Sequence, residues 1–353
     1  MNNLNQKSYR NRITHTLRSR LPSSILRLAR LRTLKGIKEV MGIYDIIKFP
    51  PPKNVVFEIT NACNLNCIMC GYRHMKRKKG YMDLDFYKKM INEIRPYVKE
   101  IRLYSTGEPL LHPNLLDMIN YAKTSDIKNI IISTNATMLN NELSQKLLSE
   151  EYVPTLLQFS VEGHDKETYE FYRDRANYQS VYNNIKQFYE LRQKLNKENP
   201  SIRINLLINK KTDVDSFVRT WGRWCDTINV SLMYPPQFYE TPDSIKEILF
   251  DVTGKYHPCY QPFTEATISY DHKLGACCGD FDFLLEMGDL DKTDLLDIWR
   301  NEEYQKLRKY LWQGKIEDSI CKGCVSVYHG DNENERYKTQ IHVNELMDQL
   351  KKT

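Results

Sequence analysis

The sequence lacks any long uninterrupted hydrophobic run, and this absence excludes a class of proteins. No stretch of the 353 residues approaches the roughly 18 consecutive apolar residues that a membrane-spanning helix needs. The first twenty residues are polar and basic, whereas a secretory signal peptide has an apolar stretch there. We therefore expect a cytoplasmic protein.

The chain also lacks internal repeats and low-complexity tracts. Hydrophobic residues make up 41% and charged residues 27% of the sequence, which is ordinary globular composition and excludes disordered, collagen-like and coiled-coil proteins. The nine cysteines are an odd number, and cytosolic thiols stay reduced. They predict metal or redox chemistry instead of disulfides, with Cys225 expected to be a small buried hydrophobic residue.

Acidic residues are nearly absent from residues 1–53, which contain twelve Lys or Arg but only Glu39 and Asp45. Apolar residues between 21 and 37 alternate with Arg and Lys, as in an amphipathic helix with a cationic face. Two interpretations stay open: a helix that covers the main domain, or peripheral contact with an anionic membrane surface. Before residue 40 the only aromatic residue is Tyr9, so we expect no specific nucleic-acid binding.

Three consecutive prolines end this basic helical arm, which we assign to residues 1–50. Over residues 51–234, predicted strands alternate with helices. The strands are 55–59, 101–104, 129–134, 156–161, 202–208 and 227–232; the helices are 84–94, 114–123, 141–149, 166–194 and 214–224. Strands with crossover helices pair in parallel, so the fold class is α/β, a partial (β/α)6 TIM-like barrel whose chemistry lies at the carboxyl ends of the strands.

A small cysteine-rich module is expected at residues 235–330, where prolines break up a loop-rich stretch. Residues 331–353 form a polar C-terminal tail whose apolar residues have helical spacing.

Three cysteines, Cys63, Cys67 and Cys70, lie within eight residues directly after the first predicted strand. A structural zinc ion takes four ligands, whereas a [4Fe–4S] cluster held by three cysteines leaves one iron open to a small molecule. A loop at this position faces the mouth of the barrel. The triplet therefore favours a cluster with an open coordination site.

This CxxxCxxC array resembles the defining motif of the radical S-adenosylmethionine superfamily. The resemblance implies that the open iron binds S-adenosylmethionine and that one electron splits it to give a 5′-deoxyadenosyl radical. It also implies an external electron donor such as flavodoxin or ferredoxin. The cofactors then perform the difficult chemistry, and the protein positions them.

Further segments resemble the family's cofactor-binding strand ends, one per strand and in order. Ser105-Thr106-Gly107-Glu108-Pro109 is similar to the GGEP motif, with Thr106 in place of the first glycine. The resemblance implies that the residues that contact S-adenosylmethionine are Met69, Gly107, Glu108, Ser133, Asn135, Ser160 and Arg173. Among these, Met69 is expected beside the adenine, and the Arg173 guanidinium is shaped to pair with the cofactor carboxylate.

Five later cysteines, Cys259, Cys277, Cys278, Cys321 and Cys324, resemble the SPASM/twitch extension that holds an auxiliary [4Fe–4S] cluster. The resemblance favours Cys259, Cys277, Cys321 and Cys324 as the four ligands, with Cys278 as an alternative to its neighbour Cys277. The same thiols would also suit a zinc ion.

A fully ligated auxiliary cluster suits electron transfer, so the leading hypothesis is an oxidoreductase that oxidises or modifies a small, sugar-like substrate. One alternative is a SPASM peptide or protein maturase, although the basic arm is shorter than the leader-binding module that many of these carry. An alternative of another class is a non-catalytic iron–sulfur or zinc protein whose basic arm binds nucleic acid. Glu58, Asn205 and Tyr234 are polar candidates for substrate contact or for filling the barrel.

Overall fold

The computed structural model describes residues 49–234, 241–251, 254–316, 321–322, 324, 328–329 and 331–352. The predicted helix in the basic arm and the prolines at 235 and 236 lie outside these residues. The chain divides into two compact units, Met1–Pro50 and Pro51–Thr353, and the fold described below is that of the second. The boundary predicted near residue 234 lies within this second unit.

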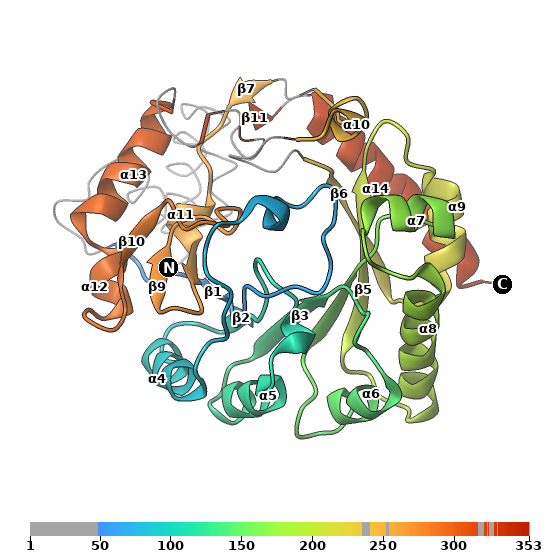
Figure 1. Ribbon diagram of the computed structural model, residues 1–353, viewed down its shortest axis with the longest axis horizontal. Helices are drawn as coiled ribbons and strands as arrows, with labels where there is room; N and C mark the ends of the chain where they lie inside the picture. The colour runs from blue at the N-terminus through green and yellow to red at the C-terminus, as the bar shows by residue number, and fades with distance from the viewer. Residues whose placement is uncertain are drawn as a thin grey trace, which may run out of the picture. The chain divides into compact units, whose positions relative to one another are not determined.

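The second unit is built around a nine-stranded sheet in the order β10-β9-β8-β1-β2-β3-β4-β5-β6. The first six strands pair in parallel, as predicted, and form the expected partial barrel. They are β1 (Asn54–Phe57), β2 (Glu100–Arg102), β3 (Asn129–Thr134), β4 (Leu156–Ser160), β5 (Ser201–Ile208) and β6 (Thr227–Leu232). Figure 1 shows the crossover helices outside this curved sheet and the chain that follows β1 across the middle of the ring.

The crossover helices begin at polar caps and bury one apolar face. The side chain of Asp83, the predicted cap of α4, accepts hydrogen bonds from the backbone of Asp85 and Phe86. These helices are α4 (Leu84–Ile94), α5 (Leu115–Thr124), α6 (Asn141–Leu147), α7 (Lys166–Tyr172), α8 (Tyr178–Lys194) and α9 (Val214–Trp221). Single 3-10 turns are η1 (Gly71–His74), η2 (Pro109–Leu111) and η3 (Gly222–Trp224).

The single helix predicted over 166–194 is wrong, because the chain breaks between α7 and α8. Arg175 has a φ of 73°, in the left-handed region, and the Asn177 side chain then caps the new helix by accepting from Ser180 N. At this break the carbonyl oxygens of Tyr172 and Asp174 accept hydrogen bonds from Ile68 N at 3.0 Å and Asn66 N at 3.2 Å, both in the cysteine loop.

The second cysteine-rich module continues the sheet, which the sequence did not predict. Strand β8 (Glu265–Ile268) pairs in parallel with β1, and β9 (Lys273–Gly275) and β10 (Glu286–Asp289) follow as antiparallel strands. The other elements are α10 (Asp243–Lys246), α11 (Gln261–Thr264), α12 (Leu295–Trp299), α13 (Glu302–Gln313) and the two-stranded sheet of β7 (Lys255–Tyr256) and β11 (Tyr328–His329). Strand β1 is therefore an interior strand, flanked by β2 and β8.

The expected terminal helix is present as α14 (Asp331–Leu350), which packs on β6 and α9. The Gln340 side chain accepts a hydrogen bond from Val230 N at 2.9 Å and donates to Ile228 O at 3.1 Å. Gln340 thus bonds the free edge of β6 as a neighbouring strand would. None of the helices in the described part of the chain is long and apolar enough to cross a membrane.

Candidate functional site

The loop after β1 brings the first three cysteines to the carboxyl-terminal edge of the parallel sheet. Cys67 is buried, and Cys63 and Cys70 are half-buried. Burial is the main cause that raises the pKa of Cys63 to about 11 and that of Cys70 to about 12. The Tyr72 hydroxyl accepts a hydrogen bond from Cys63 N and donates to Cys63 O, and Cys70 N donates to Cys67 O at 3.1 Å, so the three cysteines lie on one compact loop. Binding to iron would remove the protons of these thiols.

Two asparagines between these cysteines hold the loop against the barrel by hydrogen bonds. These asparagines were not predicted as site residues. Asn64 Nδ2 donates to Thr137 Oγ1 at 2.7 Å, and Asn64 Oδ1 accepts from Asn135 Nδ2 at 3.0 Å. On the other side, Asn66 bonds Asp174 through both its backbone and its side chain. The loop is therefore held between the end of β3 and the segment after α7.

Glu108 joins the ends of β2 and β3. Its buried carboxylate accepts hydrogen bonds from Thr134 Oγ1 at 2.6 Å, Asn135 N at 2.8 Å and Leu110 N at 3.0 Å. The preceding Gly107 has no room for a side chain, because a Cβ there would lie 2.5 Å from the Thr60 and Ala62 carbonyl oxygens. The Gly-Glu pair therefore packs against the start of the cysteine loop.

Ser133, Asn135 and Ser160, predicted to contact the cofactor, lie on adjoining strand ends. The Ser133 and Ser160 hydroxyl oxygens are 3.2 Å apart. Asn135 is buried and bonds Asn64 and Thr137. These three residues thus share one edge of the sheet with the cysteine loop.

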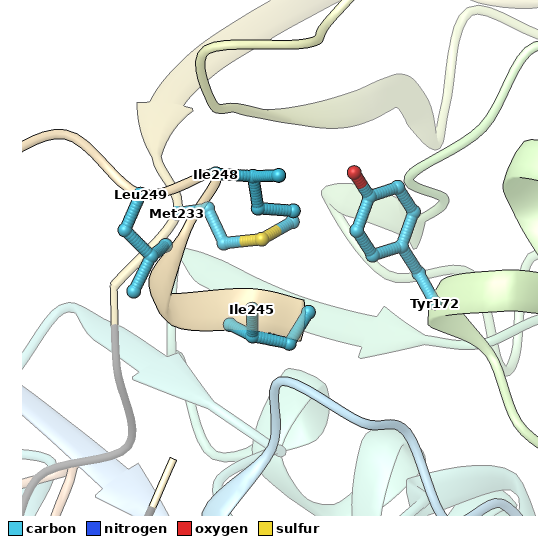
Figure 2. Packing of buried hydrophobic residues seen from close by; sticks show 5 residues of the cluster. All are labelled: Tyr172, Met233, Ile245, Ile248 and Leu249. Carbon is cyan, nitrogen blue, oxygen red and sulfur yellow. The ribbon is translucent and has the colours of Figure 1, made fainter. Parts of the chain in front are cut away.

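Met69 and its neighbour Ile68 pack against an apolar cluster above the barrel. Figure 2 shows that its members converge from separate segments, with the Tyr172 ring facing Met233 and the residues around α10: Tyr172, Met233, Ile245, Ile248 and Leu249. The Tyr172 hydroxyl also accepts a hydrogen bond from Asn209 Nδ2 at 2.8 Å. This cluster gives the cysteine loop an apolar flank that excludes water.

Arg173 lies beside the triplet, but its guanidinium fork is occupied. Nε and Nη2 bond both carboxylate oxygens of Glu162, and Nη1 lies 3.7 Å from Cys67 Sγ. Both side chains are buried. Glu162 lies two residues after the end of β4, and its pairing with Arg173 was not predicted.

The concave face of β3–β6 is polar. Residues that face the helices are buried, whereas alternate residues on the opposite face are only half-buried. Most of the latter carry hydroxyl, carboxamide or guanidinium groups: Ser133, Gln158, Ser160, Ser201, Arg203, Asn205, Asn229 and Ser231, whereas Ile131 and Leu207 are apolar. Barrel interiors are usually filled with bulky branched residues, so this face is suited to binding a polar molecule.

Of the other polar candidates, Glu58 is fully buried and pairs with Arg77 at 2.9 Å. Arg77 also bonds Asp271 at 2.7 Å and lies over the Phe283 ring. Glu58 is thus part of the contact between the barrel and the second module. Asn205 lies on the concave face, where its Oδ1 accepts from Asn229 Nδ2 at 3.4 Å, and Tyr234 is half-buried after β6.

The second group of cysteines gathers at the apolar cluster of Leu311 and Ile316, against which Cys259, Cys321 and Cys324 pack. Burial raises the pKa of Cys277 well above its usual value, and Cys278, Cys259 and Cys324 raise it further. The Cys278 sulfur instead accepts a hydrogen bond from Gln261 Nε2 at 3.0 Å. Cys225 is buried away from both groups, as expected.

The donors in both groups fit iron–sulfur clusters. In a [4Fe–4S] cluster each thiolate binds a different iron, so the sulfurs need not converge on one point. Among the residues that the structure describes, no three Cys, His, Asp or Glu side chains converge as ligands of a single metal ion do.

Comparison with known proteins gives two matches along the chain. Residues 57–196 match the radical SAM superfamily, and residues 259–325 match the SPASM iron–sulfur cluster-binding domain. The chain is 27% identical over 215 residues to a tungsten-containing aldehyde ferredoxin oxidoreductase cofactor-modifying protein of Pyrococcus furiosus, which covers 56% of this chain and 55% of that protein. It is 30% identical over 123 residues to an AdoMet-dependent heme synthase of Methanosarcina barkeri, covering 35% and 34%. The chain thus spans about half or less of these relatives.

The fold is similar to that of SuiB from Streptococcus suis. The structure of SuiB bound to S-adenosylmethionine aligns with a TM-score of 0.60 at 16% identity, covering 79% of this chain and 73% of SuiB. The structure bound to the precursor peptide SuiA aligns with a TM-score of 0.59 at 15% identity, covering 79% and 72%. With both domain matches in sequence order on this fold, the chain has a radical SAM domain at residues 57–196 and a C-terminal SPASM iron–sulfur domain at residues 259–325, and these domains imply [4Fe–4S] clusters and S-adenosylmethionine as cofactors.

Proposed function

We propose that this chain cleaves S-adenosylmethionine at a [4Fe–4S] cluster held by Cys63, Cys67 and Cys70 and uses the product to remove a hydrogen atom from a substrate. When bound, the cluster and S-adenosylmethionine supply a 5′-deoxyadenosyl radical. The observation that carries the proposal is the set of three thiols on one loop that is anchored to the end of β3 and to the segment after α7.

The chain's own residues position and shield this chemistry. Glu108 and Asn64 fix the strand ends that face the cofactor, and the cluster around Tyr172 and Met69 excludes water. We assign contact with S-adenosylmethionine to Met69 on the cysteine loop and to the residues that follow or end the strands, Gly107, Glu108, Ser133, Asn135 and Ser160. Arg173 is assigned a separate role below.

For the substrate we propose a small polar molecule that carries hydroxyl or amide groups, a class that includes sugars. The support is the row of hydroxyls and carboxamides on the concave face of β3–β6. We assign the auxiliary cluster to Cys259, Cys277, Cys321 and Cys324, because Gln261 already bonds Cys278. Since all its irons would then be ligated by protein, this cluster would accept an electron from the substrate radical, which would thereby be oxidised with loss of a proton, so that the enzyme would be an oxidoreductase.

The second candidate is a peptide-modifying enzyme. SuiB, which has a similar fold, binds a precursor peptide. A peptide backbone also carries amide groups that the carboxamides of Gln158, Asn205 and Asn229 would bond. Transfer of deuterium from labelled sugars or labelled peptides into 5′-deoxyadenosine separates the two candidates.

Anaerobic reconstitution tests the assignment. We expect about eight irons per chain and release of 5′-deoxyadenosine with dithionite and S-adenosylmethionine. Replacing Cys63, Cys67 and Cys70 together by alanine should abolish the release and leave about four irons, whereas Cys225→Ala should change neither. Release retained in the triple variant, or a colourless protein that contains only zinc, would contradict the proposal.

A further inference from the structure

The break after α7 places Arg173 at the first cysteine group. Arg173 ends the helix, where its backbone N–H still bonds Tyr169 O at 2.9 Å, and its side chain is buried beside Cys67. Its charge influences all three cysteines of the triplet and Glu108. No other cation stands among the main influences on these groups in the described part of the chain.

Glu162 holds two nitrogens of the Arg173 guanidinium, and this directs the third nitrogen at Cys67. Glu162 bonds Nε and Nη2, and a planar guanidinium held at two nitrogens has a fixed third nitrogen. That third nitrogen, Nη1, lies 3.7 Å from Cys67 Sγ, within hydrogen-bond range for sulfur. Since Glu162 is itself buried, the pair behaves as one rigid unit.

We infer that Arg173 is a positioning residue that donates a hydrogen bond to the Cys67 sulfur and so raises the reduction potential of the first cluster, with Glu162 as its anchor. The inference rests on the proposed function, in which Cys67 is a cluster ligand. One-electron reduction adds a negative charge to the cluster, and a nearby cation or a hydrogen bond to sulfur stabilises the reduced form.

The two partners should therefore shift the potential in opposite directions. Arg173→Met removes the cation and the donor, so the reduced cluster loses stabilisation and the potential falls. Glu162→Gln removes the counter-charge but keeps a hydrogen-bond acceptor for the guanidinium, so Arg173 acts at full charge and the potential rises. If Arg173 and Glu162 only maintained the fold, the two substitutions would shift the reduction potential in the same direction or leave it unchanged.

The experiment is an EPR-monitored redox titration of the full reconstituted chain with dithionite, without S-adenosylmethionine. In one set of proteins the four auxiliary cysteines are also replaced by alanine, so that the EPR signal comes from the first cluster. These cysteines are Cys259, Cys277, Cys321 and Cys324. At a fixed applied potential we expect about a tenfold lower ratio of reduced to oxidised cluster in Arg173→Met, which is about 59 mV for one electron. Glu162→Gln should show a higher ratio than the parent protein.

The matched control is Arg192→Met. Arg192 is buried and also forms a bidentate pair, with the half-buried Asp226 at 2.6 and 2.7 Å, but lies at the opposite end of the strands, where Asp226 precedes β6 and bonds Ile202 N. It should leave the ratio unchanged. If Arg173→Met leaves Glu162 buried and unpaired and the chain fails to fold, the double variant Glu162→Gln/Arg173→Met removes that charge and still lacks the donor, so its potential should lie below that of Glu162→Gln.

Failure of this inference is distinguishable from failure of the proposed function. If no cluster depends on Cys63, Cys67 and Cys70, the proposed function is wrong. If the cluster assembles and all the potentials agree, or if Arg173→Met weakens only the binding of S-adenosylmethionine, then Arg173 serves the cofactor carboxylate and the inference is wrong.

Discussion

At the scale of single residues, the site depends on side chains that join separate strand ends. Asn64 lies between two cysteines and bonds both Thr137 and Asn135. Asn135 in turn donates its backbone N–H to Glu108. A displacement of the cysteine loop would therefore be transmitted to two strand ends that we assign to cofactor binding.

Asn64→Ala should weaken the binding of S-adenosylmethionine while leaving the iron content unchanged. The variant loses two side-chain hydrogen bonds, each worth about 1 kcal/mol, so we expect up to about a 30-fold weaker affinity. Titration of the reconstituted protein with S-adenosylmethionine measures this. Asn92→Ala, which removes an exposed hydrogen bond to Tyr121 on the outer helices, is the control. Equal affinities would show that the Asn64 bonds do not position the cofactor site.

His112 predicts a pH dependence of stability. Its Nε2–H donates to Met82 O at 3.0 Å and its Nδ1 accepts from Asn114 N at 3.1 Å, so the buried ring is neutral. Burial lowers its pKa from the ordinary value of 6.5. Above pH 6.5 neither state binds a proton, whereas below it the unfolded chain does, and stability falls as the pH decreases.

We therefore expect native protein to lose up to about 1.4 kcal/mol per pH unit below pH 6.5 relative to His112→Gln. Urea unfolding of the two proteins at pH 8 and pH 5.5 measures the difference. Parallel changes in both proteins would rule out His112 as the titrating group.

The sequence identified the cysteine triplet, Gly107 and Glu108 because these signals are local: fixed spacings after one strand. It did not identify the Glu162–Arg173 pair. That contact depends on the helix break after Tyr172 and on the position of this break beside the cysteine loop in the folded chain. The triplet's asparagines gave a weak signal, since two amides flank Leu65 inside a loop that must be held in place.

At the scale of elements, α14 covers a sheet edge that would otherwise be exposed. β6 is the last parallel strand, and its free N–H and C=O groups would otherwise be open to pairing with another chain. Gln340 occupies one N–H and one C=O, and Arg336 Nε donates to Val230 O at 3.1 Å. The polar tail predicted from composition therefore has a covering role.

Gln340→Ala should speed exchange of the Val230 amide hydrogen several-fold and lower the free energy of unfolding by about 1–2 kcal/mol, because a backbone N–H loses its acceptor. Hydrogen exchange followed by mass spectrometry reports both the site and its neighbours. Glu345→Ala, on the exposed side of the same helix, should leave the exchange unchanged. Unaltered Val230 exchange in Gln340→Ala would contradict the covering role.

The six parallel strands were predictable because their hydrophobic runs alternate with capped amphipathic helices. Strand β8 was not, because four residues that are all buried show no alternation and their partner β1 lies far away in the sequence. The helix break after Tyr172 was also missed, since no glycine or proline marks it.

At the scale of the second compact unit, Arg77 connects the barrel to the SPASM module. It pairs with buried Glu58 at the end of β1, with Asp271, and with the Phe281 carbonyl oxygen. Tyr270 Oη also donates to Lys78 O at 2.5 Å. The chain directly after the cysteine triplet therefore rests on the module that we assign to the auxiliary cluster.

Arg77→Met should lower the free energy of unfolding by about 3–5 kcal/mol, because it leaves Glu58 buried without its partner. The double variant Glu58→Gln/Arg77→Met should recover most of the loss. Urea unfolding of the four proteins of this cycle gives the coupling between the two residues. Lys146→Met, which breaks the exposed pair with Glu142, should change nothing measurable. Additive effects of the two Arg77 and Glu58 changes would show that the pair is not coupled.

The position of β8 beside β1 also has a consequence for biosynthesis. Translation releases the cysteine triplet early, yet the strand that flanks β1 on its other side belongs to the last third of the chain. On the ribosome, β1 is therefore an exposed edge strand of the nascent barrel, with the cysteine loop beside it. In that intermediate, part of the structure around the three thiols is still missing. We therefore expect correct assembly of the iron–sulfur cluster only after the chain has been completed.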